Sequence, residues 1–359
     1  MPAGPPTLDA DAPLHPLKFR PRLVPKMWGG RRLAAALGKP LPPEVPVGES
    51  WELYDFPPGV VDASAEWVSA AVAEGPLAGR TLHELMVALP HRLLGHAAAV
   101  QTPAGPQFPI LVKFLDAEQD LSVQVHPDAA YAAAHPGAHL KNEAWYVLES
   151  QPGARLLKGL QRGVTRERFE RAIADGSVER LLVDLPARVG DVHYLPSGTV
   201  HALGAGMLVA EVQTPSDTTY RVYDFQRIDP STGRERELHV GQALACIDFD
   251  AAGGPEADPP VAGDEDGLLV AADQFTLSRW SAHAGMRVAL AAGTPSVMIV
   301  LEGEGGVVGE DFAEVKFRRG DTLLLPADLA GQQLDPETDC AWLEVTFPKA
   351  HRPCYGGVR

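Results

Sequence analysis

The sequence predicts a mainly β fold that contains two β-barrels and a small helical insert. Three observations lead to this prediction. Short apolar runs rich in Val, Ile, Leu and aromatic residues follow one another from residue 108 onward, and turn residues separate them. A low-complexity stretch divides these runs into two groups. The two groups also share a weak internal repeat.

Composition and charge limit the classes of function. A chain of 359 residues exceeds the usual size of one domain, and 45% hydrophobic with 22% charged residues is ordinary globular composition. The net charge of −16 argues against nucleic acid or an anionic membrane as a partner, because both require a basic surface. The N-terminus has no signal-peptide pattern and no later apolar run is long enough to span a membrane, so we expect a cytoplasmic protein.

The first hundred residues combine extended segments with one helical segment. Residues 1–16 are rich in proline and alanine and are expected to be flexible, whereas 17–30 and "GESWELYDFPPGV" have the character of strands and turns. Thr81 and Glu84 have the spacing of a capping box and precede leucines at helical spacing. A helical segment is therefore expected near 81–95.

Strands are expected to dominate from residue 108 to residue 249. The apolar runs are "FPILVKFLDA", "LSVQVH", "AWYVLES", "DVHYLP" and "MLVAEVQ". A helical insert near 165–184 interrupts them: Thr165 is expected to cap a helix that ends near Gly176, and Ser177 to cap the next one.

The stretch "DAAGGPEADPPVAGDEDG", residues 250–267, is expected to be a linker or mobile loop because it lacks periodic apolar positions. Residues 268–359 again contain short strands separated by turns, which indicates a second, smaller β domain. The pairs "AWYVLES" and "GDVHYLP" in the first group resemble "VMIVLEG" and "GDTLLLP" in the second. His201 has no histidine counterpart in the second copy.

The three cysteines, Cys246, Cys340 and Cys354, are widely separated and odd in number, so neither a disulfide framework nor a CxxC zinc site is expected. We interpret them as incidental thiols. If a metal is bound, imidazole is then the expected soft ligand.

Four potential metal ligands lie on strand-like segments. Gln124 and His126 are two residues apart and therefore point to the same face of a strand. Glu143 precedes the run "AWYVL", and His201 follows the turn "PSGTV". Three strands can bring these side chains together inside a barrel, where zinc, manganese or iron would suit them. A lone histidine is more simply a hydrogen-bonded core residue, so spacing alone leaves both a metal site and a chance grouping open.

Several long motifs, in order, resemble the compact bacterial branch of the type I mannose-6-phosphate isomerases. They are "GESWEL", "GPLAGRTL", "FPILVKFLDA", "LSVQVHP", "KNEAWYVLE", "GDVHYLPSGTVHALGAGMLVAEVQ" and "SDTTYRVYDF". The resemblance covers residues 16–229. It implies a cupin (jelly-roll-type) fold with a metal-bearing catalytic domain over 17–249 and a degenerate cupin-like domain over 268–359. It also implies one zinc ion per chain, held by Gln124, His126, Glu143 and His201.

The resemblance further implies interconversion of mannose 6-phosphate and fructose 6-phosphate through a cis-enediol. Lys113, Lys141 and Arg221 would then face the substrate, and Ser122 would help to hold it. Arg221, Lys141 and Glu211 are the implied catalytic residues, with the proton-transfer base left open between Glu211 and Lys141. A simpler interpretation of Glu211 is a salt bridge to Arg221.

Two other functions remain open from the sequence. The chain could be a non-catalytic cupin that binds a sugar or sugar phosphate, although such binding requires no proton-transfer group. It could also be a metal-dependent dioxygenase, a class that usually has iron held by histidines. The exact aldose phosphate, the task of the C-terminal barrel and the oligomeric state do not follow from the sequence.

Overall fold

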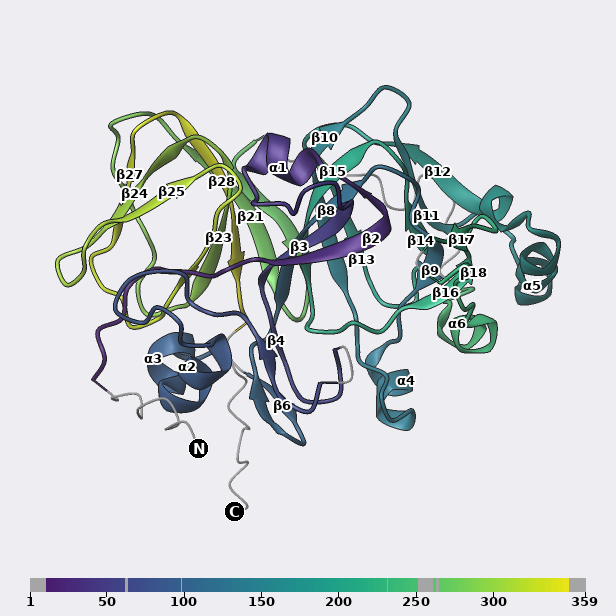
Figure 1. Ribbon diagram of the computed structural model, residues 1–359, viewed down its shortest axis with the longest axis horizontal. Coiled ribbons are helices and arrows are strands. Elements are labelled where there is room, and N and C mark those ends of the chain that lie inside the picture. The colour runs from purple at the N-terminus through teal and green to yellow at the C-terminus, as the bar shows by residue number, and fades with distance from the viewer. Residues whose placement is uncertain are drawn as a thin grey trace, which may run out of the picture. The chain divides into compact units, whose positions relative to one another are not determined.

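A computed structural model describes residues 11–61, 64–97, 99–230, 232–250, 261–262 and 265–348 (Figure 1). Most of the N-terminal segment expected to be flexible, much of the expected linker 250–267 and Cys354 lie outside the described residues. By contacts, the chain forms two compact units. The first unit comprises Met1–Phe19, Ala71–Pro109 and Val270–Arg359, and the second comprises Arg20–Ala70 and Ile110–Leu269.

The second unit contains a seven-stranded and a five-stranded antiparallel sheet. The larger sheet has the order β19-β13-β10-β15-β8-β3-β2 and the smaller the order β12-β11-β14-β9-β16. Apolar side chains from both sheets share one core, so the two sheets form the walls of a barrel. The strands are β2 (Arg22–Gly30), β3 (Val47–Leu53), β8 (Leu111–Ala117), β9 (Val123–Val125), β10 (Glu143–Ser150), β11 (Arg155–Leu160), β12 (Leu182–Pro186), β13 (Asp191–Leu195), β14 (His201–Leu203), β15 (Met207–Gln213), β16 (Tyr220–Tyr223) and β19 (Val261–Ala262).

A second apolar cluster covers the outer face of the five-stranded sheet. It includes Val123 and Val125 of β9 and the fully buried Phe169 of helix α5 (Arg166–Asp175). Helix α6 (Val240–Cys246) contributes to the same cluster. Strand side chains alternate between the two faces of a sheet. Burial of these two valines on the outer face therefore directs Gln124, which lies between them, into the barrel.

The expected helical insert is confirmed at its start and wrong at its end. The Thr165 side chain accepts a hydrogen bond from Arg168 N, and Gly176 ends α5 in the left-handed conformation. Ser177 does not cap the following 3-10 helix (Val178–Leu181), because its hydroxyl donates to Asp175 Oδ1 at 2.5 Å instead. Residues 182–184, expected within the helical segment, instead belong to strand β12, which pairs with β11.

The first unit also contains two antiparallel sheets with a core between them. Their orders are β1-β26-β23-β28-β21-β20 and β22-β27-β24-β25. Their strands are β1 (Leu17–Lys18), β20 (Gly267–Ala271), β21 (Thr276–Ala282), β22 (Val288–Ala289), β23 (Ser296–Glu302), β24 (Glu304–Val308), β25 (Val315–Arg318), β26 (Thr322–Leu325), β27 (Gln333–Pro336) and β28 (Cys340–Thr346).

The capping box of Thr81 and Glu84 is confirmed at the start of α2 (Leu82–Ala88), and α3 (Pro90–Leu94) follows. This helical segment groups with 270–359 rather than with the strands that surround it in sequence. Contacts with the loop after β26 explain this grouping. Ala327 N donates to Leu93 O at 3.1 Å, and the Arg92 side chain forms an ion pair with Asp328 at 2.6 Å. The two compact units therefore differ from the predicted domains 17–249 and 268–359, which remain a prediction.

The internal repeat is visible as a shared sheet topology. The order β13-β10-β15-β8 of the second unit corresponds to β26-β23-β28-β21 of the first, and β12-β11-β14-β9 corresponds to β25-β24-β27-β22. The predicted mainly β fold with two cupin-type barrels is confirmed.

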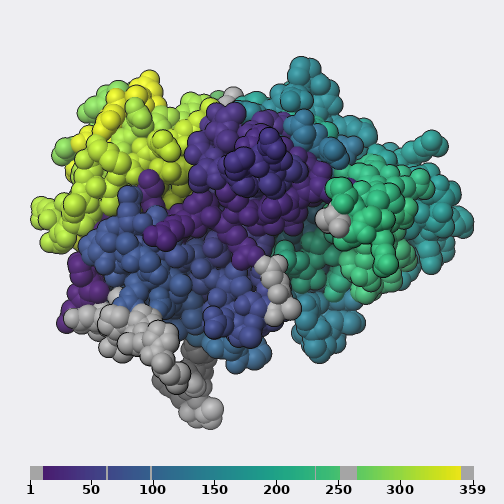
Figure 2. Space-filling view, in the orientation of Figure 1, coloured from purple at the N-terminus to yellow at the C-terminus, as the bar shows by residue number. Residues whose placement is uncertain are grey.

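The remaining elements are short, and none of the described helices is both long and apolar enough to cross a bilayer. Helix α1 and part of β2 lie at the surface on the face shown in Figure 2. The remaining short elements are α1 (Arg32–Leu37), β4 (Asp55–Phe56), β5 (Val68–Ser69), β6 (Val100–Thr102), β7 (Gly105–Gln107), α4 (Ala129–Ala134), β17 (Ile228–Asp229) and β18 (Arg234–Glu235).

Candidate metal centre

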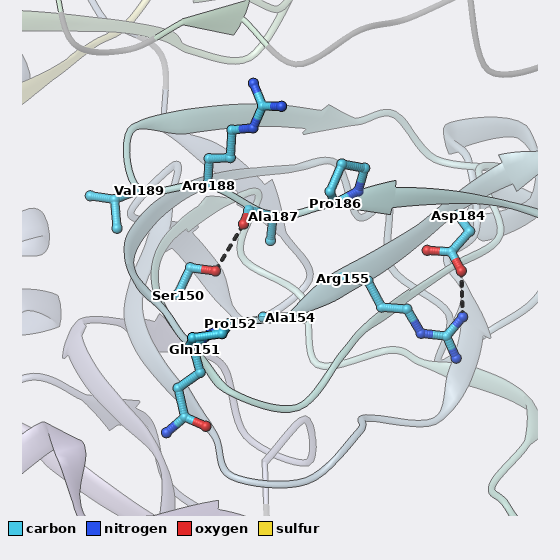
Figure 3. A pocket seen from close by; sticks show the side chains of 11 residues that line it. Ser150, Gln151, Pro152, Ala154, Arg155, Asp184, Pro186, Ala187, Arg188 and Val189 are labelled. Carbon is cyan, nitrogen blue, oxygen red and sulfur yellow. Dashed lines mark hydrogen bonds and ion pairs between the residues drawn. The ribbon is translucent and has the colours of Figure 1, made fainter.

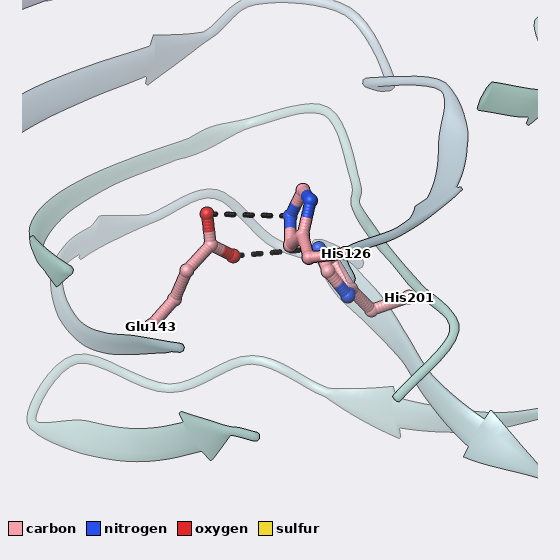
Figure 4. Close-up of side chains that lie close together, drawn as sticks. All are labelled: His126, Glu143 and His201. Carbon is pink, nitrogen blue, oxygen red and sulfur yellow. Dashed lines mark ion pairs between the residues drawn. The ribbon is translucent and has the colours of Figure 1, made fainter. Parts of the chain in front are cut away.

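Three buried side chains of the second unit form a compact group of metal-ligand type. One ligand atom from each of His126, Glu143 and His201 lies within 4.8 Å of the others. The Nε2 atoms of the two histidines lie 3.4 Å from Oε1 and Oε2 of the carboxylate, one on each oxygen (Figure 4). All three side chains are at most 2% exposed. The geometry thus aims two imidazoles and a carboxylate at one point.

The strand register explains how these residues meet. Glu143 begins β10, His201 begins β14, and His126 directly follows β9. His201 pairs in register with Gln124, so the two side chains share the inner face of the five-stranded sheet. The amide nitrogen of Gln124 lies 3.5 Å from His201 Nε2. The fourth predicted ligand is therefore adjacent to the group, and rotation of its amide would present the oxygen to the same point.

Backbone carbonyls set the tautomer of both imidazoles. His126 Nδ1 lies 3.0 Å from Thr218 O, and His201 Nδ1 lies 2.9 Å from Thr199 O. A carbonyl oxygen only accepts hydrogen bonds, so each Nδ1 carries the proton. Each neutral ring then directs the lone pair of Nε2 toward Glu143. Histidine ligands of metals are commonly oriented in this way.

The electrostatics favour the charge state that binds metal. Burial and the positive charge of Lys141 together lower the pKa of His126 to about 3. Burial also lowers the pKa of His201. For Glu143, burial raises the pKa, but its surroundings, chiefly the positive charge of Lys141, outweigh this effect and hold the pKa well below its usual value. Neutral imidazoles and an ionised carboxylate are the forms that bind a cation.

One atom in the group indicates directly that a cation would fit. Glu143 Oε2 is buried and has no hydrogen-bond partner among the described residues. Its neighbour, His201 Nε2, has no proton to donate when Nδ1 is protonated. A buried carboxylate oxygen without a donor is costly, and a divalent cation would satisfy it. Nitrogen and oxygen donors of this kind suit zinc, manganese or iron.

Lys141 lies against this group. Its Nζ lies 2.6 Å from Glu143 Oε1 and 3.3 Å from His126 Nε2, and the residue is buried. The structure thus places this predicted substrate-binding lysine beside two of the predicted metal ligands.

A row of side chains on neighbouring strands forms a second part of the site. Trp51, Lys113, Glu211 and Trp145 occupy successive register positions on β3, β8, β15 and β10. Lys113 Nζ lies 3.6 Å from Glu211 Oε2, and Trp145 Nε1 donates to Glu211 Oε1 at 2.9 Å. Lys113, not Arg221, is therefore the ion-pair partner of Glu211, and the simpler interpretation of Glu211 from sequence is wrong.

The surroundings of Glu211 bring the pKa of its carboxyl group into the neutral range. Burial, and after it the negative charge of Glu143, raise the pKa of its carboxyl to a net value of about 7. The positive charges of Lys113 and Lys141 offset only part of it. A carboxyl group with such a pKa can exchange protons at physiological pH.

Glu49 lies beside this row, although the sequence analysis assigned it no role. It lies 3.6 Å from Lys113 Nζ and 3.1 Å from Lys26 Nζ. Burial raises the pKa of Glu49, but Lys113 and Lys26 outweigh it and bring the pKa to about 2. The carboxylate of Glu49 within the strand-like motif "GESWEL" is a signal from which a buried partner could have been inferred.

Arg221 and His201 lie on opposite sides of Gln124, because β16 and β14 flank β9, and Ser122 lies beside Arg221. Arg221 pairs in register with Gln124, and its Nε donates to Ser122 Oγ at 3.2 Å. Ser122 Oγ in turn lies 3.3 Å from Gln124 Oε1. Among the described residues, Arg221 does not contact His126, Glu143 or His201. The predicted residues thus form two sets, one with Lys141 and Glu211 and one in which Arg221, Ser122 and Gln124 contact one another.

A cavity of about 600 Å³ in the same unit lies apart from these residues (Figure 3). Residues of two segments, 150–155 and 184–189, line it, and an ion pair between Arg155 and Asp184 at 2.5 Å lies along one side. None of the predicted site residues lines this cavity.

Comparison with known proteins identifies the family. Residues 17–153 match the family model "Phosphomannose isomerase type I, catalytic domain". The mannose-6-phosphate isomerase of Streptococcus mutans is 37% identical over 333 residues, which cover 90% of this chain and 96% of that protein. The mannose-6-phosphate isomerase ManA of Bacillus subtilis is 34% identical over 332 residues, which cover 91% of this chain and 98% of that protein.

Solved structures of mannose 6-phosphate isomerases share the fold of this chain. A crystal structure of mannose 6-phosphate isomerase from Bacillus subtilis superposes with a TM-score of 0.78 and 29% identity, covering 92% of this chain and 99% of that one. A zinc-bound mannose 6-phosphate isomerase shares the fold with a TM-score of 0.69 at 16% identity, covering 92% of this chain and 99% of that one. The chain belongs to the type I phosphomannose isomerase family.

Proposed function

We propose that this chain interconverts mannose 6-phosphate and fructose 6-phosphate with one zinc ion bound per chain. The observation that carries the proposal is the buried group of His126, Glu143 and His201, which lies next to a carboxyl of raised pKa at Glu211. A metal-ligand group beside a proton-transfer group is what an aldose–ketose isomerisation requires. A binding protein would need neither the second group nor its pKa.

Gln124, His126, Glu143 and His201 would hold the zinc ion. When bound, zinc would supply electrophilic stabilisation for the oxygen that becomes negatively charged as the proton moves between C1 and C2. The two carbonyls that accept from the histidine Nδ1 atoms hold the rings in the ligand orientation.

We assign the proton transfer to Glu211. The Trp145 indole N–H fixes one carboxyl oxygen, and the Lys113 ammonium lies close to the other. A general base works best when its pKa lies near the operating pH, and a value of about 7 meets this condition. Lys141, the alternative base, is engaged by Glu143 at 2.6 Å and is better suited to orient that ligand and to donate to a substrate oxygen.

Arg221 and Ser122 would bind the phosphate. Arg221 is a partly buried guanidinium without a carboxylate at ion-pair distance among the described residues, and it donates to Ser122 and to a backbone carbonyl. A desolvated arginine whose partners are neutral is prepared to bind an anion in a bidentate manner. Binding energy at the phosphate end would hold the reacting carbons in place.

The decisive experiment is a coupled assay of fructose 6-phosphate formation from mannose 6-phosphate. The purified protein is assayed as isolated, after removal of metal by a chelator, and after zinc is restored. We expect activity that disappears with the metal and returns with zinc. Absence of activity in the protein with measured, stoichiometric zinc would refute the proposal, and oxygen consumption with bound iron would support a dioxygenase instead.

Replacement of Arg221 by Ala is expected to lower kcat/KM by about 10- to 100-fold, because one charge-assisted interaction with the phosphate is lost. Zinc content should stay at the wild-type level, since Arg221 does not contact the metal-ligand group. Steady-state kinetics and elemental analysis of the same preparation test this. Loss of zinc in the variant would show a structural role for Arg221.

A further inference from the structure

Asp224 binds two arginines near Arg221. Its carboxylate accepts from Arg227 at 2.5 Å and from Nε and an η nitrogen of Arg236 at 2.6 and 2.5 Å. Burial raises the pKa of Asp224, but the hydrogen bonds of Arg236 and Arg227 outweigh it, so the pKa lies below its usual value. With only 5% of its surface exposed, Asp224 is an ionised, nearly buried link between two chain segments.

One of these segments supports Arg221 directly. The Glu237 carbonyl, next to Arg236 in the chain, accepts from the guanidinium of Arg221 at 2.9 Å. His239 N donates to Arg221 O at 2.7 Å. The ion pair between Asp224 and Arg236 therefore fixes the segment that aims the guanidinium of Arg221 toward Ser122.

The other segment is a strained turn. Phe225 and Gln226 both have left-handed backbone conformations, with φ of 55° and 53°, which non-glycine residues rarely adopt. Arg227 holds this turn: its guanidinium donates to Asp120 O at 2.5 Å and lies 5.1 Å from the centre of the Phe225 ring. Strained backbone of this kind persists where the surroundings hold it and is often found at functional sites.

Charge provides a second reason for the position of Asp224. Burial lowers the pKa of Arg221, and the positive charges of Arg236 and Arg227 add to this effect. Three guanidinium groups thus repel one another, and the carboxylate of Asp224 offsets this repulsion. A cavity of about 510 Å³ lies beside them and is lined by Arg221, Thr232, Arg234 and Arg236 among others.

We propose that Asp224 is a positioning residue: through Arg236 and Arg227 it holds the guanidinium of Arg221 in the orientation that binds the substrate phosphate. This inference rests on the proposed function of Arg221. Asp224 itself is not expected to touch the substrate. Without its negative charge, Arg236 and Arg227 lose their common partner, and the carbonyl that aims Arg221 is no longer fixed.

The test is a double-mutant cycle with Asp224→Asn and Arg221→Ala. We expect Asp224→Asn to lower kcat/KM about 10-fold or more, mainly through a higher KM, with zinc content unchanged. The double variant should be no worse than Arg221→Ala alone, because the effect of Asp224 passes through Arg221. Losses that add in the double variant, or an unchanged Asp224→Asn enzyme, would overturn the inference.

Two further measurements keep the test decisive. Asp184→Asn removes a carboxylate from another Arg–Asp ion pair of the same unit and should leave the kinetics unchanged. If Asp224→Asn does not fold, Arg236→Gln breaks the same link and should show the same non-additivity with Arg221→Ala.

If the wild-type protein does not isomerise mannose 6-phosphate, the proposed function fails. Calorimetric binding of inorganic phosphate then still tests Asp224, since equal affinities of wild type and Asp224→Asn would contradict its role.

Discussion

Replacement of His201 by Ala is expected to remove bound zinc and isomerase activity together. The imidazole of His201 is almost fully buried, its Nδ1 is fixed by Thr199 O, and its Nε2 points at the Glu143 carboxylate. Since loss of a residue that only supports a ligand already costs about 10- to 100-fold in metal affinity, loss of a ligand itself should exceed about 100-fold.

Elemental analysis after gel filtration measures bound zinc, and the coupled assay measures activity over a range of added zinc. His283→Ala is the matched control, because His283 is 81% exposed and lies in the other unit. Wild-type activity in a His201→Ala protein that contains no metal would refute the site. A folded variant that retains stoichiometric zinc but lacks activity would instead assign His201 to the chemistry and not to the metal.

One part of the metal site was predictable because it depends on a local rule. Alternation along a strand places Gln124 and His126 on one face. Spacing left open whether Glu143 and His201 join them, and the structure adds the register that pairs Gln124 with His201 and the contacts of Glu143 with both histidines. The cap of α5 at Thr165 and its end at Gly176 also depend on residues within one turn. Features whose causes lie within a few residues of one another can be predicted from sequence.

Features that depend on distant pairing could not be predicted in the same way. The simpler interpretation of Glu211 was a salt bridge to Arg221, ten residues away, but the sheet register places Lys113 of β8 beside it. Glu49 received no role because its partner Lys113 is far away in sequence. In each case the deciding contact comes from a partner that the local pattern does not specify.

Replacement of Glu211 by Gln is expected to lower kcat by about 100- to 10,000-fold while zinc stays bound. Glutamine keeps the size of the side chain and can still accept from the Trp145 indole, but it cannot take up the proton that moves between C1 and C2. Zinc should remain because Glu211 is not among the proposed ligands. The comparison between kcat and metal content therefore separates loss of a base from loss of the site.

The pH profile identifies the base independently of the size of the loss. A base must be ionised, so activity should rise with pH as Glu211 loses its proton and then level off. Its pKa of about 7 applies to the site without metal, and a bound divalent cation lowers it, so the rise should occur at or below pH 7. Residual activity of Glu211→Gln should lack this rise. If Lys141→Met, with zinc retained, removes the rise and Glu211→Gln keeps it, the proton transfer belongs to Lys141. Glu211 would then act only as the partner that Lys113 and Trp145 hold beside the metal.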